Sequence, residues 1–165
     1  MKTSVKKPLL FAEIITAAVL ILFIVFCIRG NAAVRDDVSL DELKSGLLGA
    51  VSGAGNMHEA GAMKLKALYG LSENDYEEVV LYAPASNMDA QEMLLVRCKS
   101  TDQTALVEEA MKKRIENQIK TFESYGVEQM AIISKAVVDI RGNYCLYICD
   151  ADSGAVKDIF EQKLS

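Results

Sequence analysis

The strongest folding signal in the chain is VVDIRGNYCLYIC, residues 137–149. Two runs rich in β-branched and aromatic residues flank Gly142-Asn143, a pattern typical of a β-hairpin with a two-residue turn. That turn pairs Ile140 with Cys145, so alternate side chains make one hairpin face uniformly apolar, whereas the other face mixes charged and apolar groups. We therefore expect a sheet whose apolar face is covered by helices.

The same reasoning extends to the segments on both sides of the hairpin. Alternating patterns predict two further strands, over residues 78–83 and 92–99. Apolar residues at spacings of three and four predict a long helix from about residue 101 to 124, a short one over 127–134 and a last one over 153–163. The expected fold is α+β: a mainly antiparallel four-stranded sheet in ββα-ββα order, with helices packed on one face.

Two more helices are expected before the first strand. Ser39 and Glu42 form a capping box that starts a helix ending near Val51. After several glycines, a second helix is predicted over residues 57–69, closed by Gly70. The domain that contains all these elements would span residues 39–165.

Composition excludes several functional classes. The chain has 165 residues and a net charge of −5, but residues 31–165 hold 14 basic and 22 acidic groups, a net charge of −8. Such a domain repels phosphate backbones, so we expect no nucleic-acid partner. One histidine and no cysteine pair at ligand spacing predict no metal, no cofactor and no His-based triad.

Residues 9–28 form a nearly uninterrupted apolar run that is long enough to span a bilayer as a helix. Lysines before it predict a cytoplasmic segment over residues 1–8, a retained single-pass anchor, a connector over 29–38 and an extracytoplasmic domain in the cell envelope. A cleaved signal peptide is the alternative, with Gly30-Asn31-Ala32 as a weak site. Phe26 before Cys27 argues against a lipoprotein.

Glu13 is the one charged residue within the apolar run. An ionisable group in hydrocarbon is costly and often marks a contact with a partner. Because Glu13 lies near the cytoplasmic end, it could instead reach the headgroups. Both placements remain open, and Glu13 is a candidate contact for a partner helix.

Polar residues cluster where the two predicted strands at 78–83 and 92–99 are joined. Asn87, Asp89 and Glu92 could bind a cation or a polar ligand, and Arg114 at the rim of the long helix's apolar stripe could reach them or a ligand. In the simpler interpretation Asn87 or Asp89 caps a turn, Glu92 is solvated and Arg114 covers the core rim.

Three cysteines and the single histidine have weaker functional interpretations. Cys145 and Cys149 lie too far apart along one strand to bridge, whereas Cys98 could pair with either one if its strand is adjacent. Small buried hydrophobic residues are the favoured interpretation. His58 is interpreted as a surface residue.

A resemblance appears over residues 40–163, carried by residues 75–92, Arg114, residues 122–126 and residues 141–144. These segments resemble an uncharacterised family, a domain of unknown function, of membrane- or lipid-anchored exported proteins of Gram-positive anaerobic bacteria. The resemblance implies an accessory role beside a membrane-bound O-acyltransferase as partner. It implies no activity.

Three functions follow from these observations. The first is a non-catalytic, membrane-anchored binding domain of the cell envelope that acts through a protein partner or a surface polymer. The second is a ligand-sensing ectodomain that signals through a partner helix at Glu13. The third, and least supported, is an envelope enzyme using Asp89 or Glu92, since no nucleophile, base and oxyanion donor can be identified together.

Overall fold

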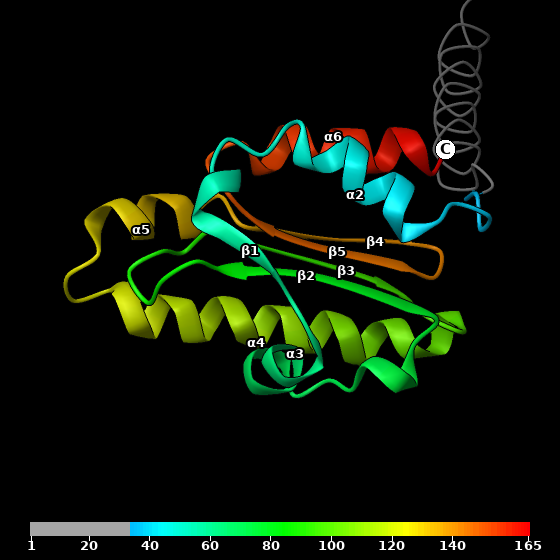
Figure 1. Cartoon of the computed structure of the whole chain (residues 1–165), viewed down its shortest axis with the longest axis horizontal. Coiled ribbons are helices and arrows are strands. Elements are labelled where there is room, and N and C mark those ends of the chain that lie inside the picture. Colours follow the sequence, from blue (N-terminus) through cyan, green and yellow to red (C-terminus); the bar gives the residue numbers. More distant parts are fainter. Residues whose placement is uncertain (1–33) are drawn as a thin grey trace, which may run out of the picture. The chain divides into compact units, whose positions relative to one another are not determined.

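Residues 34–165 are described by the computed structural model and confirm an α+β fold (Figure 1). The regular elements in chain order are α2 (Leu40–Leu48), β1 (Met57–Ala60), α3 (Ala62–Tyr69), β2 (Glu78–Pro84), β3 (Glu92–Arg97), α4 (Thr104–Phe122), α5 (Val127–Ile133), β4 (Val137–Arg141), β5 (Tyr144–Cys149) and α6 (Ser153–Lys163). Short 3-10 turns cover Ala54–Asn56, Glu73–Asp75 and Thr101–Gln103.

The five strands form one antiparallel sheet in the order β1-β2-β3-β5-β4. The predicted hairpin is confirmed, since Ile140 is paired with Cys145 and Val138 with Tyr147. Gly142 in its turn has a φ of 56°, a left-handed conformation that glycine adopts without steric cost. β3 and β5 lie at the centre, which explains why nearly all their residues are buried.

The prediction of four strands was wrong, because residues 57–60 form a fifth. The expected helix over 57–69 begins only at Ala62, and Met57–Ala60 pairs instead with the far side of β2. His58 and Glu59 are exposed on this edge strand. Four residues of weak β propensity carry little periodic signal, so this strand depends on the hydrogen bonds that β2 offers.

Helices cover both faces of the sheet, so the expectation of one covered face was also wrong. Figure 1 shows α2 and α6 on one face and α3 and α4 on the other. Apolar side chains of α2 and α6, such as Leu43 and Phe160, pack with Leu146 of β5, and Val107 of α4 packs with Tyr147 on the opposite face. The hairpin face that mixed charged and apolar residues is therefore a second core.

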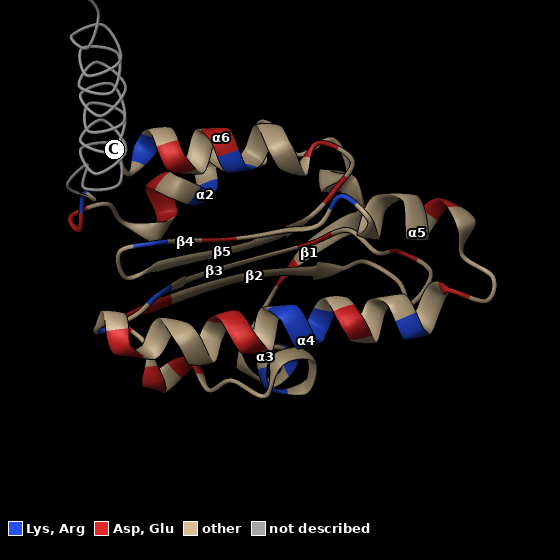
Figure 2. Cartoon of the chain, turned by 180° about the vertical axis from the view of Figure 1, so that it is seen from behind, with Lys and Arg blue, Asp and Glu red and all other residues tan. Residues whose placement is uncertain are grey.

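Two helix ends show how sequence positions the helices around the sheet. The backbone N–H of Glu42 donates to Ser39 Oγ at 3.3 Å, the N-cap that the sequence predicts. Gly70 ends α3 in the left-handed conformation, with its N–H donating to the carbonyl of Lys66. Figure 2 shows acidic and basic residues interspersed along the ribbon of the long helix α4.

The predicted cytoplasmic segment (1–8), the anchor (9–28) and Glu13 lie outside the described residues. Residues 34–38 of the predicted connector are described, and Val38 is fully buried in the core below α2. Within residues 34–165, no helix is both long and apolar enough to cross a bilayer.

Candidate functional site

Glu92 is a fully buried carboxylate at the first position of β3. Its parity along the strand is that of Leu94 and Val96, so its side chain points into the core beneath α3 and α4. A buried charge must be paired and hydrogen-bonded to be tolerated. The neighbours of Glu92 must therefore supply a counter-charge and hydrogen-bond donors.

Arg114 of α4 supplies the counter-charge through several hydrogen bonds. Its Nε donates to both Glu92 oxygens at 3.1 and 3.0 Å, and its Nη2 donates to Oε2 at 2.6 Å. The Arg114 side chain is 14% exposed, whereas that of Glu92 is 0% exposed. Charge-assisted contacts of this kind fix the plane of the guanidinium as well as its position.

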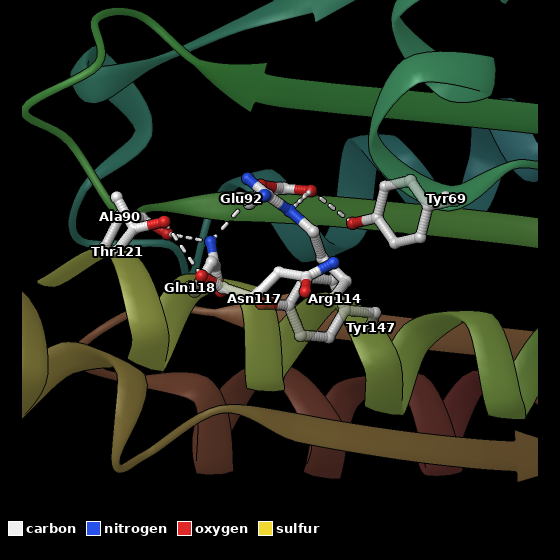
Figure 3. Close-up of polar contacts among 8 residues, drawn as sticks. All are labelled: Tyr69, Ala90, Glu92, Arg114, Asn117, Gln118, Thr121 and Tyr147. Carbon is white, nitrogen blue, oxygen red and sulfur yellow. Dashed lines mark hydrogen bonds and ion pairs between the residues drawn. The ribbon is translucent and has the colours of Figure 1, made fainter. Parts of the chain in front are cut away.

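Three uncharged side chains complete the shell around the ion pair (Figure 3). The Tyr69 hydroxyl donates to Glu92 Oε1, and Gln118 Nε2 donates to Oε2 at 3.3 Å and to the Ala90 carbonyl at 3.0 Å. The Tyr147 hydroxyl in turn donates to Gln118 Oε1. Both carboxylate oxygens are thus occupied by donors from two helices. We call Tyr69, Glu92, Arg114, Gln118 and Tyr147 the Glu92 network.

The titration behaviour of the Glu92 network keeps its donors protonated. Burial, and after it the negative charge of Glu92, raises the pKa of Tyr69 well above its ordinary value. Burial likewise raises the pKa of Tyr147. For Arg114, burial by itself lowers the pKa, but the hydrogen bonds and charge of Glu92 outweigh it and raise the pKa overall. Every donor in the shell keeps its proton at physiological pH.

A pocket of about 210 Å³ opens directly beside the ion pair, between α3, α4 and the β2–β3 connection. Its polar lining consists of Lys64, Ser86, Asn87, Asp89, Arg114, Gln118 and Thr121. Among residues 34–165, nothing accepts a hydrogen bond from Nη1 of Arg114, and this atom is not completely buried. The guanidinium therefore uses two nitrogens to hold Glu92 and keeps the third free, on a side chain that lines the pocket.

A family model matches residues 50–150, more than half of the chain. The family is described as a domain of unknown function, DUF4358. The chain belongs to the DUF4358 family. Every residue of the Glu92 network lies within the matched segment of the DUF4358 domain, whereas α2 and α6 lie outside it. Comparison with curated proteins and with solved structures found no match to either.

The four predicted site residues of the DUF4358 domain meet at this place, but with different roles. Asn87, Asp89 and Arg114 line the pocket, while Glu92 lies behind Arg114 and reaches no solvent. The interpretation of Glu92 as solvated was wrong. Asp89 does cap a turn, since its Oδ2 accepts from the N–H and hydroxyl of Ser86 at 3.1 and 2.8 Å.

Tyr69, Gln118 and Tyr147 were absent from the predicted site. Gln118 lies three residues after Ile115 and seven after Met111, on the helix stripe that the apolar spacing defines. A glutamine at such a position signals a buried polar contact. The tyrosines gave no comparable signal, because a buried tyrosine is ordinary in an apolar core.

The cysteines of the DUF4358 domain are buried and free. Cys98, directly after β3, and Cys145 of β5 have their Sγ atoms 3.9 Å apart, and of the two pairings considered this is the one in contact. Burial raises the pKa of Cys149 to about 12, which leaves its thiol protonated at neutral pH. No group of three or more potential metal-ligating side chains occurs in the described part of the chain.

Proposed function

We propose that this DUF4358 domain is a non-catalytic binding domain of the cell envelope, tethered by residues 9–28, that holds a polar group of a surface polymer in the pocket beside Arg114. The main support for this proposal is the way in which Arg114 is held. A buried, fully paired carboxylate fixes its guanidinium, and one donor remains free on this pocket-lining side chain. Preorganised donors bind ligands with little loss of side-chain entropy.

The chemistry of the pocket favours binding over catalysis. A general base must come within hydrogen-bond reach of the proton that it removes. Glu92 is shielded by Tyr69, Arg114 and Gln118, so its carboxylate acts on Arg114 and not on a ligand. Asp89 is the other carboxylate at the pocket, and one of its oxygens is committed to the Ser86 turn.

We infer the cell-envelope location from the sequence. The apolar run over residues 9–28 supports a membrane anchor, and the lysines before it support export of the domain. A domain of net charge −8 is repelled by anionic polymers, so its attachment to such a polymer requires a specific site rather than general electrostatic attraction. A membrane-bound O-acyltransferase that modifies the same polymer is the partner that the family resemblance suggests.

Retention of polymer by the tethered protein tests this proposal. The full chain is reconstituted in nanodiscs and mixed with the surface-polymer fraction of its host, and the polymer that co-sediments is measured. Arg114→Lys keeps the charge beside Glu92 but replaces the three-nitrogen guanidinium by a single ammonium, which cannot hold Glu92 and serve the pocket in the same way, so we expect at least about a tenfold loss of retention.

The exposed neighbour on the same helix gives a matched control. Lys113→Arg exchanges the same two residue types in the opposite direction at a position outside the pocket, and it should retain polymer like the wild type. Equal retention by Arg114→Lys and the wild type would contradict the proposal.

A further inference from the structure

We infer that the group held in the Arg114 pocket is an uncharged sugar ring. This inference rests on the proposed function and specifies its ligand. The charge of the pocket differs from the strongly negative charge of the domain. Lys64 and Arg114 contribute two positive charges, while Asp89 at the rim and Glu92 behind Arg114 contribute two negative ones. The pocket is formally neutral within a domain of net charge −8.

A neutral pocket with charged walls matches a ligand that has many dipoles and no net charge. An anion would be attracted by Lys64 and Arg114 but repelled by the carboxylate of Asp89. A cation would be attracted by Asp89 but repelled by Lys64 and Arg114. In both cases, an unbalanced charge would be removed from water without full compensation, which is costly.

The free hydrogen-bonding groups at the pocket are of both kinds. Nη1 of Arg114 is a donor without an acceptor among residues 34–165, and the ammonium of Lys64 is a further donor at the pocket. Within the described residues, Oδ1 of Asp89 is likewise an acceptor without a donor, because both hydrogen bonds from Ser86 go to Oδ2. The Asn87 amide offers a donor and an acceptor. Sugar hydroxyls donate and accept at once, so adjacent hydroxyls can satisfy such a mixed set.

The rest of the lining suits the other surface of a sugar. Leu68, Pro84 and Phe122 contribute apolar atoms on the walls between the polar groups. A pyranose ring carries C–H groups on its faces and hydroxyls around its edge, so it needs apolar and polar contacts side by side. The volume of about 210 Å³ is below the roughly 300 to 1,000 Å³ of pockets for drug-sized ligands, which points to a single ring.

Binding of small saccharides to the full chain in nanodiscs tests the inference. The probes are methyl glucoside and methyl N-acetylglucosaminide as neutral rings, glucuronate as an anionic ring, glucosamine as a cationic ring, and glycerol phosphate as an anion without a ring. Saturation-transfer NMR gives the relative affinities. We expect at least one neutral ring to bind saturably and at least about fivefold tighter than every charged probe.

Two charge variants sharpen the test. Asp89→Asn preserves a side chain that can cap the Ser86 turn and leaves the pocket with one positive charge, so the preference should move toward glucuronate. Lys64→Gln leaves one negative charge, so the preference should move toward glucosamine. Lys113→Gln removes an exposed lysine of α4 outside the pocket and should leave the wild-type order unchanged.

The outcomes separate the sugar assignment from the proposed function. If glucuronate or glycerol phosphate binds the wild type tighter than the neutral rings, or if no ring binds at all, the sugar assignment is overturned. Polymer retention that depends on Arg114 would still support the binding domain in that case. If retention does not depend on Arg114, the proposed function fails whatever the saccharides do.

Discussion

Glu92 illustrates how a single residue can look like a surface group and belong to the core. Its charge suggested solvent exposure, but it shares the strand face of Leu94, Val96 and Cys98. That parity was a usable signal, and it is the pairing with Arg114 that makes the position tolerable. Sequence alone could not show the pair, because Glu92 and Arg114 lie on different elements and only the fold brings them together.

The Tyr69 hydroxyl should be needed for stability, because it is one of the donors that satisfies the buried carboxylate. We expect Tyr69→Phe to lower the free energy of unfolding by about 1–3 kcal/mol. Tyr82→Phe is the matched control, since its contact with Glu59 is long, at 3.3 Å, and exposed. Urea-induced unfolding of residues 34–165 measures both changes. A loss for Tyr82→Phe as large as that for Tyr69→Phe would contradict the assigned role.

Asp150 provides a prediction on pH dependence. Burial alone would raise its pKa, but hydrogen bonds from the backbone of Asp152, Ser52 and Gly53 and from the Ser52 hydroxyl lower the pKa below its ordinary value. A lowered folded-state pKa adds stability above the unfolded pKa of about 3.9. That contribution disappears as the pH falls through the folded-state value.

Asp150→Asn should therefore cost about 1–3 kcal/mol of unfolding free energy at pH 7. The difference from the wild type should shrink as the pH is lowered below about 4. Asp158→Asn, an exposed position on α6, should change stability by less than about 0.5 kcal/mol at either pH. Unfolding measured from pH 7 to pH 3 distinguishes these cases, and a difference that stays constant with pH would refute the role of the charge.

Among the secondary-structure elements, those with a strong periodic pattern were predicted correctly, whereas the short edge strand β1 was missed. The hairpin, β2, β3 and the long helix α4 were predicted because each has several repeats of its own pattern. β1 was missed because four residues after a glycine-rich segment can follow either pattern. The second covered face was missed because Tyr144, Leu146 and Ile148 share it with the charged residues Asp139 and Arg141, which suggested exposure to solvent. α2 and α6 instead bury its apolar side chains.

The glycine-rich segment between α2 and β1 is held closely against the loop that follows β5. A Cβ atom added to Gly53 would lie 2.6 Å from Cγ of Gln91 and 2.7 Å from Oδ2 of Asp150, whereas one added to Gly55 would meet nothing within 4 Å. Gly53→Ala should therefore destabilise the domain by about 1–3 kcal/mol.

Gly55→Ala should be neutral or stabilise by up to about 1 kcal/mol, because it reduces the freedom of the unfolded chain. Thermal unfolding of the two variants gives the sign directly. Equal effects at the two positions would show that the close approach at Gly53 does not constrain the fold.

At the scale of the whole domain, one face of the sheet forms a closed core and the other supports the pocket. α2 and α6 cover one face of the sheet and complete a core that no pocket described above enters, whereas α3 and α4 cover the other face and place Arg114 beside a pocket. Sequence reasoning identified the polar cluster but not its division into a buried support and an open rim. That division depends on the packing of α3 and α4 on β3.

The most direct measurement of the central claim blocks the pocket without touching the Glu92 network. Thr121 is exposed at the pocket, and its hydroxyl bonds only within α4, to the Asn117 carbonyl at 2.8 Å. Retention of surface polymer by Thr121→Tyr in nanodiscs is measured together with its unfolding free energy. We predict loss of retention by at least about tenfold with stability within about 0.5 kcal/mol of the wild type. Wild-type retention by this variant would contradict the account.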